Sequence, residues 1–400
     1  MTSTGNATTP RPRRPINRDA KRVLLFNNPL TGHFLPMLPL ARALRQQGHA
    51  VAFATAAGMA ASVEAEGFEL VPAGPTTDAV IAEVARRTGS DILAGRTPEL
   101  VAEFFAGARV DLTLDEALAG AGDWAPDLVV SEHLDFVGPL VAAVRKLPSA
   151  VMAIDPALEP ELLDALAAAA HSRYLDRGLE APTHAPSGRW LLDLCPPSLQ
   201  RGGALPALER IALRPEPHQR PEGTPRAPRV PGTGRPRVLV SFSTAPGASA
   251  KLGPVLRSLS ALDIDLVATA GGVPAQDFGL EPGRAEVFSF LPAAELLDGV
   301  SAVVHHGGSG TTFGAAARGV PAVVVPGTSG QQRQADRLAA AGAGLALPVG
   351  KQEPDSIAAA VDRLLAEPAF TRAAHRIRDE IAAMPSASEV AERLTASVSG

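Results

Sequence analysis

The chain contains a single cysteine, Cys195, among its 400 residues. One cysteine cannot form an internal disulfide, and a cysteine-based metal site would need further thiols. The histidine and acidic residues also show no grouping with the spacing of metal ligands. We therefore expect Cys195 to pack in the core, the protein to work in a reducing, cytoplasmic environment, and no metal to be bound.

Long apolar runs are also missing. Segments such as SAVVHH and VPAVVVPG are far shorter than the roughly 20 residues that a membrane-spanning helix needs. The first residues, MTSTGNATTPRPRRPINRDAK, are polar and lack the apolar centre of a secretory signal. We expect residues 1–21 to form a disordered tail and the chain to cross no membrane.

The charge pattern excludes another class of partner. The formal net charge is −5 and the isoelectric point is about 6.0. Apart from the extreme N-terminus, the basic residues are scattered, whereas nucleic acid binding needs a basic stripe or patch. Nucleic acid is therefore not an expected partner. The 46% of hydrophobic residues indicates a globular protein, and a length well above about 250 residues favours two domains.

A dinucleotide-binding fingerprint is absent as well. The first strand-to-helix loop reads NNPLTGHFLP and lacks the G-x-G-x-x-G that seats a pyrophosphate, which disfavours a nicotinamide or flavin oxidoreductase. Instead, Gly32 and His33 stand at the junction of loop and helix, where open parallel sheets place their ligands. The alternative for His33 is a residue that only caps the helix or packs in the core.

Apolar runs and amphipathic segments alternate in the first half of the chain. RVLLFNNP reads as a buried strand, FLPMLPLARALRQQ as a helix that Gly48 ends, and AVAFAT as a second strand. Further strands are expected in FELVPAG, PDLVVSE and SAVMAID, with a helix from Pro98 to Ala121. Residues 22–214 therefore read as a Rossmann-like doubly wound domain.

The same alternation restarts after a linker. Residues 215–235 are rich in proline and glycine, which exclude a regular element. Strands follow in RPRVLVSFSTAPG, IDLVATAGG, AEVFSF, SAVVHHGG and PAVVVPG, and a long amphipathic helix is broken at Pro368. Residues 236–385 read as a second Rossmann-like domain, followed by a C-terminal helix over residues 386–400. The expected architecture is α/β, with the two domains facing each other across a cleft.

A glycine-rich turn follows one of these strands. In HHGGSGTT, the glycines at 307, 308 and 310 let the backbone turn tightly and approach a ligand. Thr311 and Thr312 open a helix whose free N–H groups suit a phosphate. An ordinary strand-to-helix turn is the alternative.

Two long stretches resemble one protein family. The pattern GHxxPxLxLAxxLxxxGH over residues 32–49 and the stretch over residues 303–344 resemble the opening and donor-binding signatures of the GT-B nucleotide-sugar glycosyltransferases of antibiotic, macrolide and plant secondary metabolism. LCPPSLQ, ALRP and AAMPSASEVAERL add to the likeness, which covers nearly all of the chain past residue 21. The resemblance implies a GT-B fold and an inverting hexosyltransferase that uses a dTDP- or UDP-linked sugar and no further cofactor.

On the acceptor side, the resemblance makes His33 the general base. A neutral imidazole, with an ordinary pKa near 6.5, is suited to take a proton from an acceptor hydroxyl. In the family, an aspartate at the end of the PDLVV strand commonly orients this histidine, and the matching residue here is Glu132. A glutamate can accept the same hydrogen bond. The alternative for Glu132 is a solvated carboxylate at a strand end.

On the donor side, the resemblance implies that His306 and backbone N–H groups stabilise the leaving diphosphate, while His305 finishes the strand. The positions that match the family's donor-binding residues are Ser243, Thr244, Phe290, Leu291, His306, Gly308, Ser309, Gly310, Thr311 and Gln331. The alternative for Phe290 is core packing. Relatives place an aspartate before Gln331 to hold sugar hydroxyls, and this chain has Gly330. A deoxysugar would have no hydroxyl to occupy that carboxylate, so Gly330 favours a deoxysugar donor. The alternatives are a shift of the loop or a protein that has lost catalysis.

We therefore expect an enzyme that moves a sugar to a hydroxyl group of a small secondary metabolite such as an antibiotic aglycone, with residues 76–122 and 156–203 shaping the acceptor pocket. The alternative is a non-catalytic auxiliary protein that activates a partner transferase, although such a helper would need neither His33 nor His306. A nucleotide-sugar epimerase shares the architecture but not the Gly32-His33 signature. A homodimer and an auxiliary protein both stay open as partners.

Overall fold

The structure, a computed structural model, describes residues 20–182, 186–200, 208–221, 224, 234–242, 248–269, 275–278, 280 and 285–398. Residues 1–19 of the expected tail lie outside these ranges. None of the helices in the described part of the chain is long and apolar enough to cross a bilayer.

Within the described residues, seven parallel strands form the first sheet, in the order β3-β2-β1-β4-β5-β6-β7. In β1 the apolar run from Val23 to Phe26 is buried on both faces, as a central parallel strand requires. The strands are β1 (Arg22–Phe26), β2 (Ala50–Thr55), β3 (Glu69–Pro72), β4 (Leu128–Glu132), β5 (Ser149–Ala153), β6 (Trp190–Asp193) and β7 (Glu209–Ala212).

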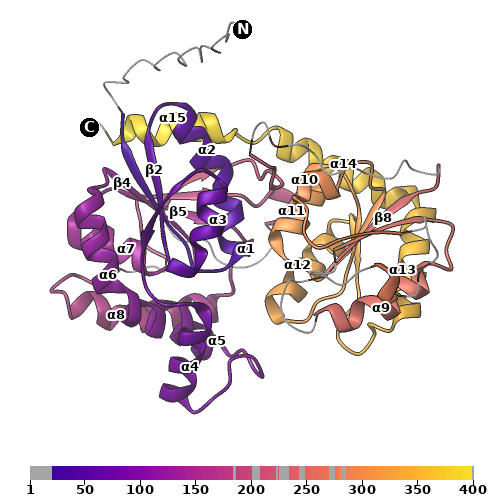
Figure 1. The fold of residues 1–400 in the computed structure, drawn as a ribbon, viewed down its shortest axis with the longest axis horizontal. Helices are drawn as coiled ribbons and strands as arrows, with labels where there is room; N and C mark the ends of the chain where they lie inside the picture. Colours follow the sequence, from indigo (N-terminus) through magenta and orange to yellow (C-terminus); the bar gives the residue numbers. More distant parts are fainter. Residues whose placement is uncertain are drawn as a thin grey trace, which may run out of the picture.

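Helices cover both faces of this sheet (Figure 1). They are α1 (Thr31–Phe34), α2 (Leu38–Gln46), α3 (Ala60–Ala65), α4 (Thr77–Thr88), α5 (Pro98–Ala102), α6 (Arg109–Trp124), α7 (Val137–Arg145) and α8 (Pro160–Leu175). The helix expected from Pro98 to Ala121 is present, but it contains a π-helical turn, Glu103–Ala108, between α5 and α6. The helix ends at Trp124, three residues beyond the predicted Ala121, and the next residue, Ala125, lies in the left-handed region with a φ of 51°.

In the described part of the second half, six parallel strands form a sheet in the order β10-β9-β8-β11-β12-β13. The strands are β8 (Arg237–Ser241), β9 (Asp265–Thr269), β10 (Ala285–Phe288), β11 (Ala302–His305), β12 (Ala322–Val324) and β13 (Gly344–Ala346). Its helices are α9 (Ala248–Leu259), α10 (Ala293–Leu296), α11 (Ser309–Ala317), α12 (Ser329–Ala340), α13 (Pro354–Ala366), α14 (Pro368–Ala382) and α15 (Ala387–Ser397). Two doubly wound sheets confirm the expected α/β fold class.

The last helices return the chain to the first half of the molecule. Pro368 separates α13 from α14, as the sequence predicted, because proline lacks the N–H that a continuous helix needs. A capping box at Ser386 and Glu389 starts α15. This helix packs against α2, and the Gln47 side chain donates hydrogen bonds to Ser388 (Figure 1).

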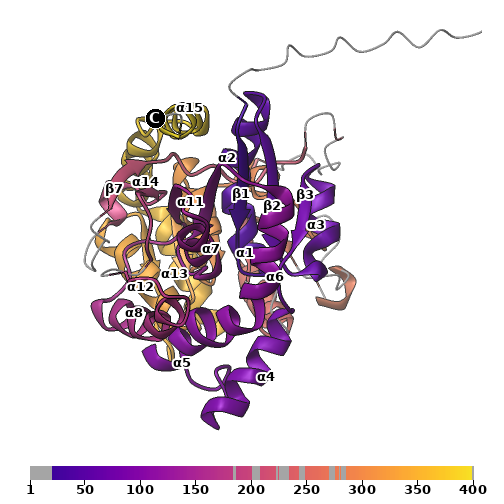
Figure 2. The ribbon, with the colours of Figure 1, turned by 90° about the vertical axis from the view of Figure 1, so that its left-hand side faces the viewer.

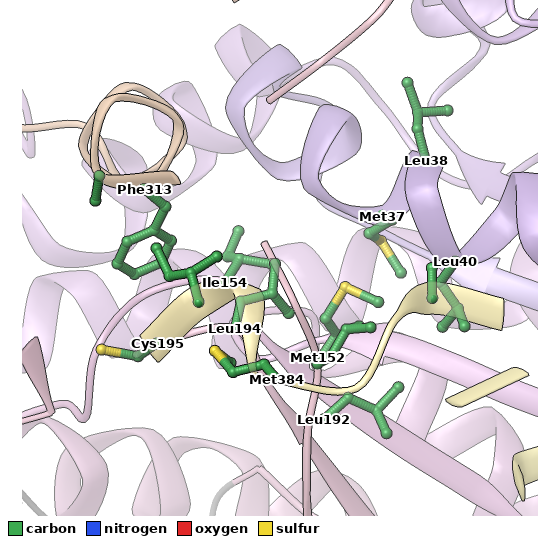
Figure 3. Packing of buried hydrophobic residues seen from close by; sticks show 14 of the residues in the cluster. Met37, Leu38, Leu40, Met152, Ile154, Leu192, Leu194, Cys195, Phe313 and Met384 are labelled. Atoms are coloured by element: carbon green, nitrogen blue, oxygen red, sulfur yellow. The ribbon is translucent and has the colours of Figure 1, made fainter. Parts of the chain in front are cut away.

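One hydrophobic cluster includes residues from both halves. Figure 3 shows Phe313 of α11 close to Ile154 and Leu194, which lie just beyond the carboxyl ends of β5 and β6. Met384, between α14 and α15, belongs to the same cluster. Apolar packing therefore holds α11 against the strand ends of the first sheet.

The linker is bound to both halves. His218 Nε2 lies 2.9 Å from Glu66 Oε1 in the first half, and the Arg220 Nε–H donates to Glu295 Oε1 of α10.

The order of the strands reverses between β1 and β4 in one sheet and between β8 and β11 in the other. In open α/β sheets, ligands bind outside the carboxyl ends of such strands. Figure 2 shows the ribbon turned by 90° about the vertical axis.

Candidate active site

The two predicted catalytic residues lie side by side. His33 is in α1, directly after β1, and Glu132 is the last residue of β4, the neighbouring strand. His33 Nδ1 lies 2.9 Å from Glu132 Oε1. The Glu132 side chain is fully buried, whereas 16% of the His33 side chain is exposed. Glu132 is therefore not a solvated strand-end carboxylate, and the alternative reading of this residue is wrong.

Further N–H groups hold the Glu132 carboxylate. The Asn28 side-chain amide donates to Oε1, and the Leu134 backbone N–H donates to Oε2 at 2.7 Å. Burial raises the pKa of Glu132, but His33, through its charge and its hydrogen bond, together with the charge of His133 and the Leu134 N–H, lowers it to about 2. An ionised carboxylate can only accept hydrogen bonds, so Nδ1 of His33 donates the proton. Nε2 is then the nitrogen that can accept one.

Charge around His33 favours its protonated form. Burial alone would lower the pKa of His33, but Glu132, through its charge and its hydrogen bond, raises it above the ordinary 6.5. Asp155 and Asp135 add to this effect. The imidazole is therefore a stronger base than a free histidine.

A second buried carboxylate lies behind this pair. Asp135 is fully buried, and its Oδ1 accepts the Gly138 backbone N–H at 2.8 Å. Burial raises the pKa of Asp135 to about 7, with the nearby Arg109 charge opposing the shift and Glu132 adding to it. Arg109 is itself buried and donates to the Ala73 carbonyl and to Thr113. The two buried carboxylates thus shift in opposite directions, with the pKa of Glu132 lowered and that of Asp135 raised.

The glycine-rich turn leads from β11 into α11. Gly307 has a φ of +93°, and a Cβ there would lie 2.8 Å from the Gln331 carbonyl oxygen, so glycine is required. Gly308 is the N-cap of α11 and has no side chain to bond the first N–H groups. A Cβ on Gly310 would meet no atom within 4 Å. Ser309, Gly310 and Thr311 form a first helical turn that an anion can approach.

The two neighbouring histidines differ in surroundings. His305 is fully buried, its Nδ1 accepts the Gly307 N–H at 3.1 Å, and burial lowers its pKa to about 3. His306 folds back over the turn, because a Cβ on Gly308 would lie 2.7 Å from its Nε2. Burial also lowers the pKa of His306. Both rings are therefore neutral at physiological pH, and the His306 ring lies beside Gly308, the N-cap of α11.

A contact between the two halves was missed by the sequence analysis. Ser309 Oγ donates to Asp155 Oδ1, and Gln334 Nε2 of α12 donates to Ser309 Oγ. Asp155 Oδ2 lies 3.7 Å from Nε2 of His133, the residue after Glu132. Asp155 thus contacts Ser309 in the first turn of α11 on one side and lies near His133, the neighbour of Glu132, on the other. Asp155 is the last residue of the predicted strand SAVMAID, and this position at a strand end was the only signal in the sequence.

The other predicted donor-binding residues are distributed around the second sheet. Phe290 is 56% exposed, so the core-packing alternative for this ring is wrong, while the Leu291 side chain is buried in the core. Gln331 Oε1 accepts the Gly327 N–H at 2.8 Å. Ser243 and Thr244 lie outside the described residues.

Gly330 lies in the first turn of α12 with no positive φ, and a Cβ there would meet only Arg333 Nη2, at 3.6 Å. This position therefore accepts a side chain without backbone strain. Among the described residues, no group of three or more histidine, cysteine or acidic side chains could hold a metal ion.

Known proteins match nearly the whole chain. The family described as erythromycin biosynthesis protein CIII-like matches residues 42–214 with its N-terminal domain and residues 254–397 with its C-terminal domain. The elloramycin glycosyltransferase ElmGT of Streptomyces olivaceus is 32% identical over 93% of this chain and 96% of its own length. The TDP-daunosamine transferase DnrS of Streptomyces peucetius is 30% identical over 94% of this chain and 97% of its own length.

A solved structure is similar over the same extent. The glycosyltransferase SsfS6 of Streptomyces sp. SF2575, complexed with thymidine diphosphate, has a TM-score of 0.78 and 26% identity to this chain. The match covers 94% of this chain and 99% of that chain.

Proposed function

This chain belongs to the erythromycin biosynthesis protein CIII-like family and is a glycosyltransferase. We propose that it transfers a deoxysugar from a thymidine diphosphate carrier to a hydroxyl group of a small aglycone. The transfer inverts the configuration at the anomeric carbon of the sugar. The two parallel-sheet domains of the chain have the GT-B fold that the sequence resemblance implied. The residues that perform the transfer follow from the site.

The His33 and Glu132 pair is the observation that carries the proposal. The hydroxyl of the acceptor gives its proton to Nε2 of His33 while its oxygen attacks the anomeric carbon of the sugar. The bond between that carbon and the diphosphate oxygen breaks, and the electron pair leaves with the diphosphate. Attack on the face opposite the leaving group inverts the configuration. Glu132 holds the ring through Nδ1, 2.9 Å away, and stabilises the imidazolium that forms.

The first turn of α11 supports a role in receiving the diphosphate. Its uncapped N–H groups and the positive end of the helix dipole favour an anion, and Gly310 borders open space. His306 lies against the same turn and would donate to charge that grows as the bond breaks. We expect no metal to be needed, because helix and side-chain donors can neutralise the leaving group.

The identity of the donor is carried over from relatives and from Gly330. One relative is named for a TDP-linked sugar, and a similar structure holds thymidine diphosphate, so thymidine is the favoured nucleotide and uridine the alternative. Gly330 offers no carboxylate to a sugar hydroxyl, although α12 has room for one. An absent carboxylate fits a sugar that lacks the hydroxyl.

The proposal is tested by transfer with the purified protein alone. We expect thymidine diphosphate to bind in calorimetry, and a TDP-deoxysugar with a panel of aglycones to give a product of inverted configuration, read by mass spectrometry and NMR. Product that forms only when a second transferase is added would replace the proposal with the auxiliary-protein alternative. An absence of nucleotide binding would overturn it.

The setting of the enzyme is part of the same proposal. A single cysteine fits a reducing cytoplasm. A homodimer and an auxiliary protein remain the two partner hypotheses, and the transfer assay with purified protein, run alongside light scattering, separates them.

A further inference from the structure

The start of α12 lies between the turn proposed for the diphosphate and the first half of the chain. A Cβ on Gly307, in the turn before α11, would lie 2.8 Å from a carbonyl oxygen in the first turn of α12. In the same helix, Arg337 Nη2 donates to the carbonyl oxygen of Ala157, which belongs to the first half, at 2.8 Å. Both helices lie on the side of the second half that faces the first (Figure 1). A sugar that links a diphosphate on α11 to an acceptor at His33 therefore lies next to the start of α12.

Arg333 lies beside Gly330 at the start of this helix. A Cβ on Gly330 would lie 3.6 Å from Arg333 Nη2, so the guanidinium borders the space that the missing side chain leaves. The two residues are three positions apart and share one face of α12. The Arg333 side chain is 27% exposed, so a ligand can reach it. A guanidinium carries N–H donors, no acceptor and a permanent positive charge. The space next to Gly330 is therefore bordered by hydrogen-bond donors and a cation.

Glu159 of the first half pairs only loosely with this arginine. Its Oε1 lies 3.5 Å from Arg333 Nε, beyond the range of about 2.7–3.2 Å that is usual for an N–H···O hydrogen bond. Glu159 approaches Nε, whereas Nη2 is the atom that borders the Gly330 space. Two other nearby charges, Arg337 and Asp155, are opposite in sign and act on each other. Arg333 therefore decides the sign of the field next to Gly330.

We propose that Arg333 contacts the transferred sugar and selects a neutral deoxysugar over an amino sugar. The inference rests on the proposed function, because it places the sugar between α11 and His33. A hydroxyl or ether oxygen of the sugar can accept a hydrogen bond from Nη2. An ammonium group in the same place would bring a donor against a donor and a positive charge against a positive charge. A carboxylate at position 330 would attract the ammonium, and Gly330 supplies none.

Two substitutions separate recognition of the sugar from the loss of an ion pair. Arg333→Gln removes the positive charge, whereas Glu159→Gln removes its partner and leaves the charge uncompensated. Both break the same ion pair, so a purely structural role predicts the same effect for both. Arg393→Gln is the matched control, since it removes the same charge from a partly exposed ion pair between α15 and Glu209.

The probes are three thymidine-linked sugars that differ in one functional group. They are TDP-6-deoxyglucose and its two analogues with an ammonium group in place of the hydroxyl at C3 or at C4. Binding is measured by calorimetry at neutral pH, with thymidine diphosphate as the reference that carries no sugar. This reference distinguishes a contact between Arg333 and the sugar from one between Arg333 and the diphosphate.

We expect the wild type to bind TDP-6-deoxyglucose about five- to tenfold more tightly than at least one of the ammonium analogues. Arg333→Gln should remove most of this preference, Glu159→Gln should increase it, and Arg393→Gln should leave it unchanged. None of the three substitutions should change the binding of thymidine diphosphate.

Three results would overturn the inference. They are equal binding of all three sugars by the wild type, a shift of the preference in the same direction in Arg333→Gln and Glu159→Gln, and a loss of affinity in Arg333→Gln that is as large for thymidine diphosphate as for the TDP-sugar. If an amino sugar is transferred as readily as a neutral one, only this inference fails. If neither nucleotide binding nor transfer occurs, the proposed function fails.

Discussion

Replacing Glu132 by glutamine tests the coupling between the base and its buried carboxylate. The substitution keeps the size of the side chain and removes its charge from a position 2.9 Å from His33 Nδ1. At an effective dielectric constant of about 20, opposite charges about 4 Å apart attract by about 4 kcal/mol, which corresponds to about three pKa units. Observed effects of one carboxylate on a neighbour span about one to three units. Burial of His33 remains, so its pKa should fall below 6.5.

Hydrogen bonding adds a second effect. Oε1 of Glu132 faces N–H donors of Asn28 and His33, and Oε2 faces the Leu134 N–H. The amide NH2 of a glutamine would oppose a donor in either orientation, and a buried unsatisfied donor costs about 1–3 kcal/mol. With the NH2 toward His33, the ring would have to accept at Nδ1 and carry its proton on Nε2. We therefore expect turnover at the pH optimum to fall about tenfold to a hundredfold.

The assay is the initial transfer rate between about pH 5 and pH 9, because this range brackets histidine titration. His33 must be neutral to accept a proton, so kcat/KM rises with pH through the pKa of His33. The wild-type midpoint should lie above 6.5, and Glu132→Gln should move it to lower pH. Glu132→Asp is the matched control, since it keeps the charge and should keep the midpoint close to the wild-type value. A common midpoint for wild type and Glu132→Gln would refute the reasoning.

Three further substitutions test the remaining roles. His33→Ala should abolish transfer and leave binding of thymidine diphosphate nearly intact, because the base acts from the acceptor side; near-normal turnover would make His33 a structural residue. His306→Ala should weaken the binding of thymidine diphosphate, measured by calorimetry, and raise the activation barrier of transfer by about 3 kcal/mol, the usual effect of losing one donor to developing charge. Equal affinities of wild type and variant for thymidine diphosphate would mean that the backbone of the turn, and not the His306 side chain, binds the diphosphate. Gly330→Asp should narrow the preference for a TDP-deoxysugar over TDP-glucose by about 1.5–3 kcal/mol, the range for a hydrogen bond to a charged group. Gly330→Asn is the control for size, and equal use of both donors by the wild type would contradict the deoxysugar argument.

The order of elements followed largely from the sequence. Apolar runs such as RVLLF are buried on both faces only in a central parallel strand, and their alternation with amphipathic helices predicted both sheets. The break at Pro368 and the end of the first long helix near Gly48 were also readable, because proline and glycine act through local backbone chemistry. His33 was found because a loop after a central strand lies at the ligand-binding edge of such a sheet.

Short and distant features were not readable. Strands β6 and β7 have four residues each, WLLD and ERIA, too few to show a period. They join the sheet because β6 pairs with the open edge of β5 and β7 then pairs with β6. The π-helical turn could not be predicted from the sequence either, because a helix with one added residue keeps nearly the same apolar pattern.

Burial and partners were decided by the tertiary structure. The residue type and strand-end position of Glu132 allowed either a solvated or an enclosed carboxylate, and the packing around β1 and β4 enclosed it. The sequence of Phe290 allowed either a donor-binding ring or a core residue, and the tertiary structure leaves the side chain exposed. Asp155 and Ser309 are 154 positions apart in the chain and meet because apolar packing holds α11 against the end of β5. Local pattern determines which elements form, whereas the environment of a polar group depends on which distant elements the hydrophobic core brings against it.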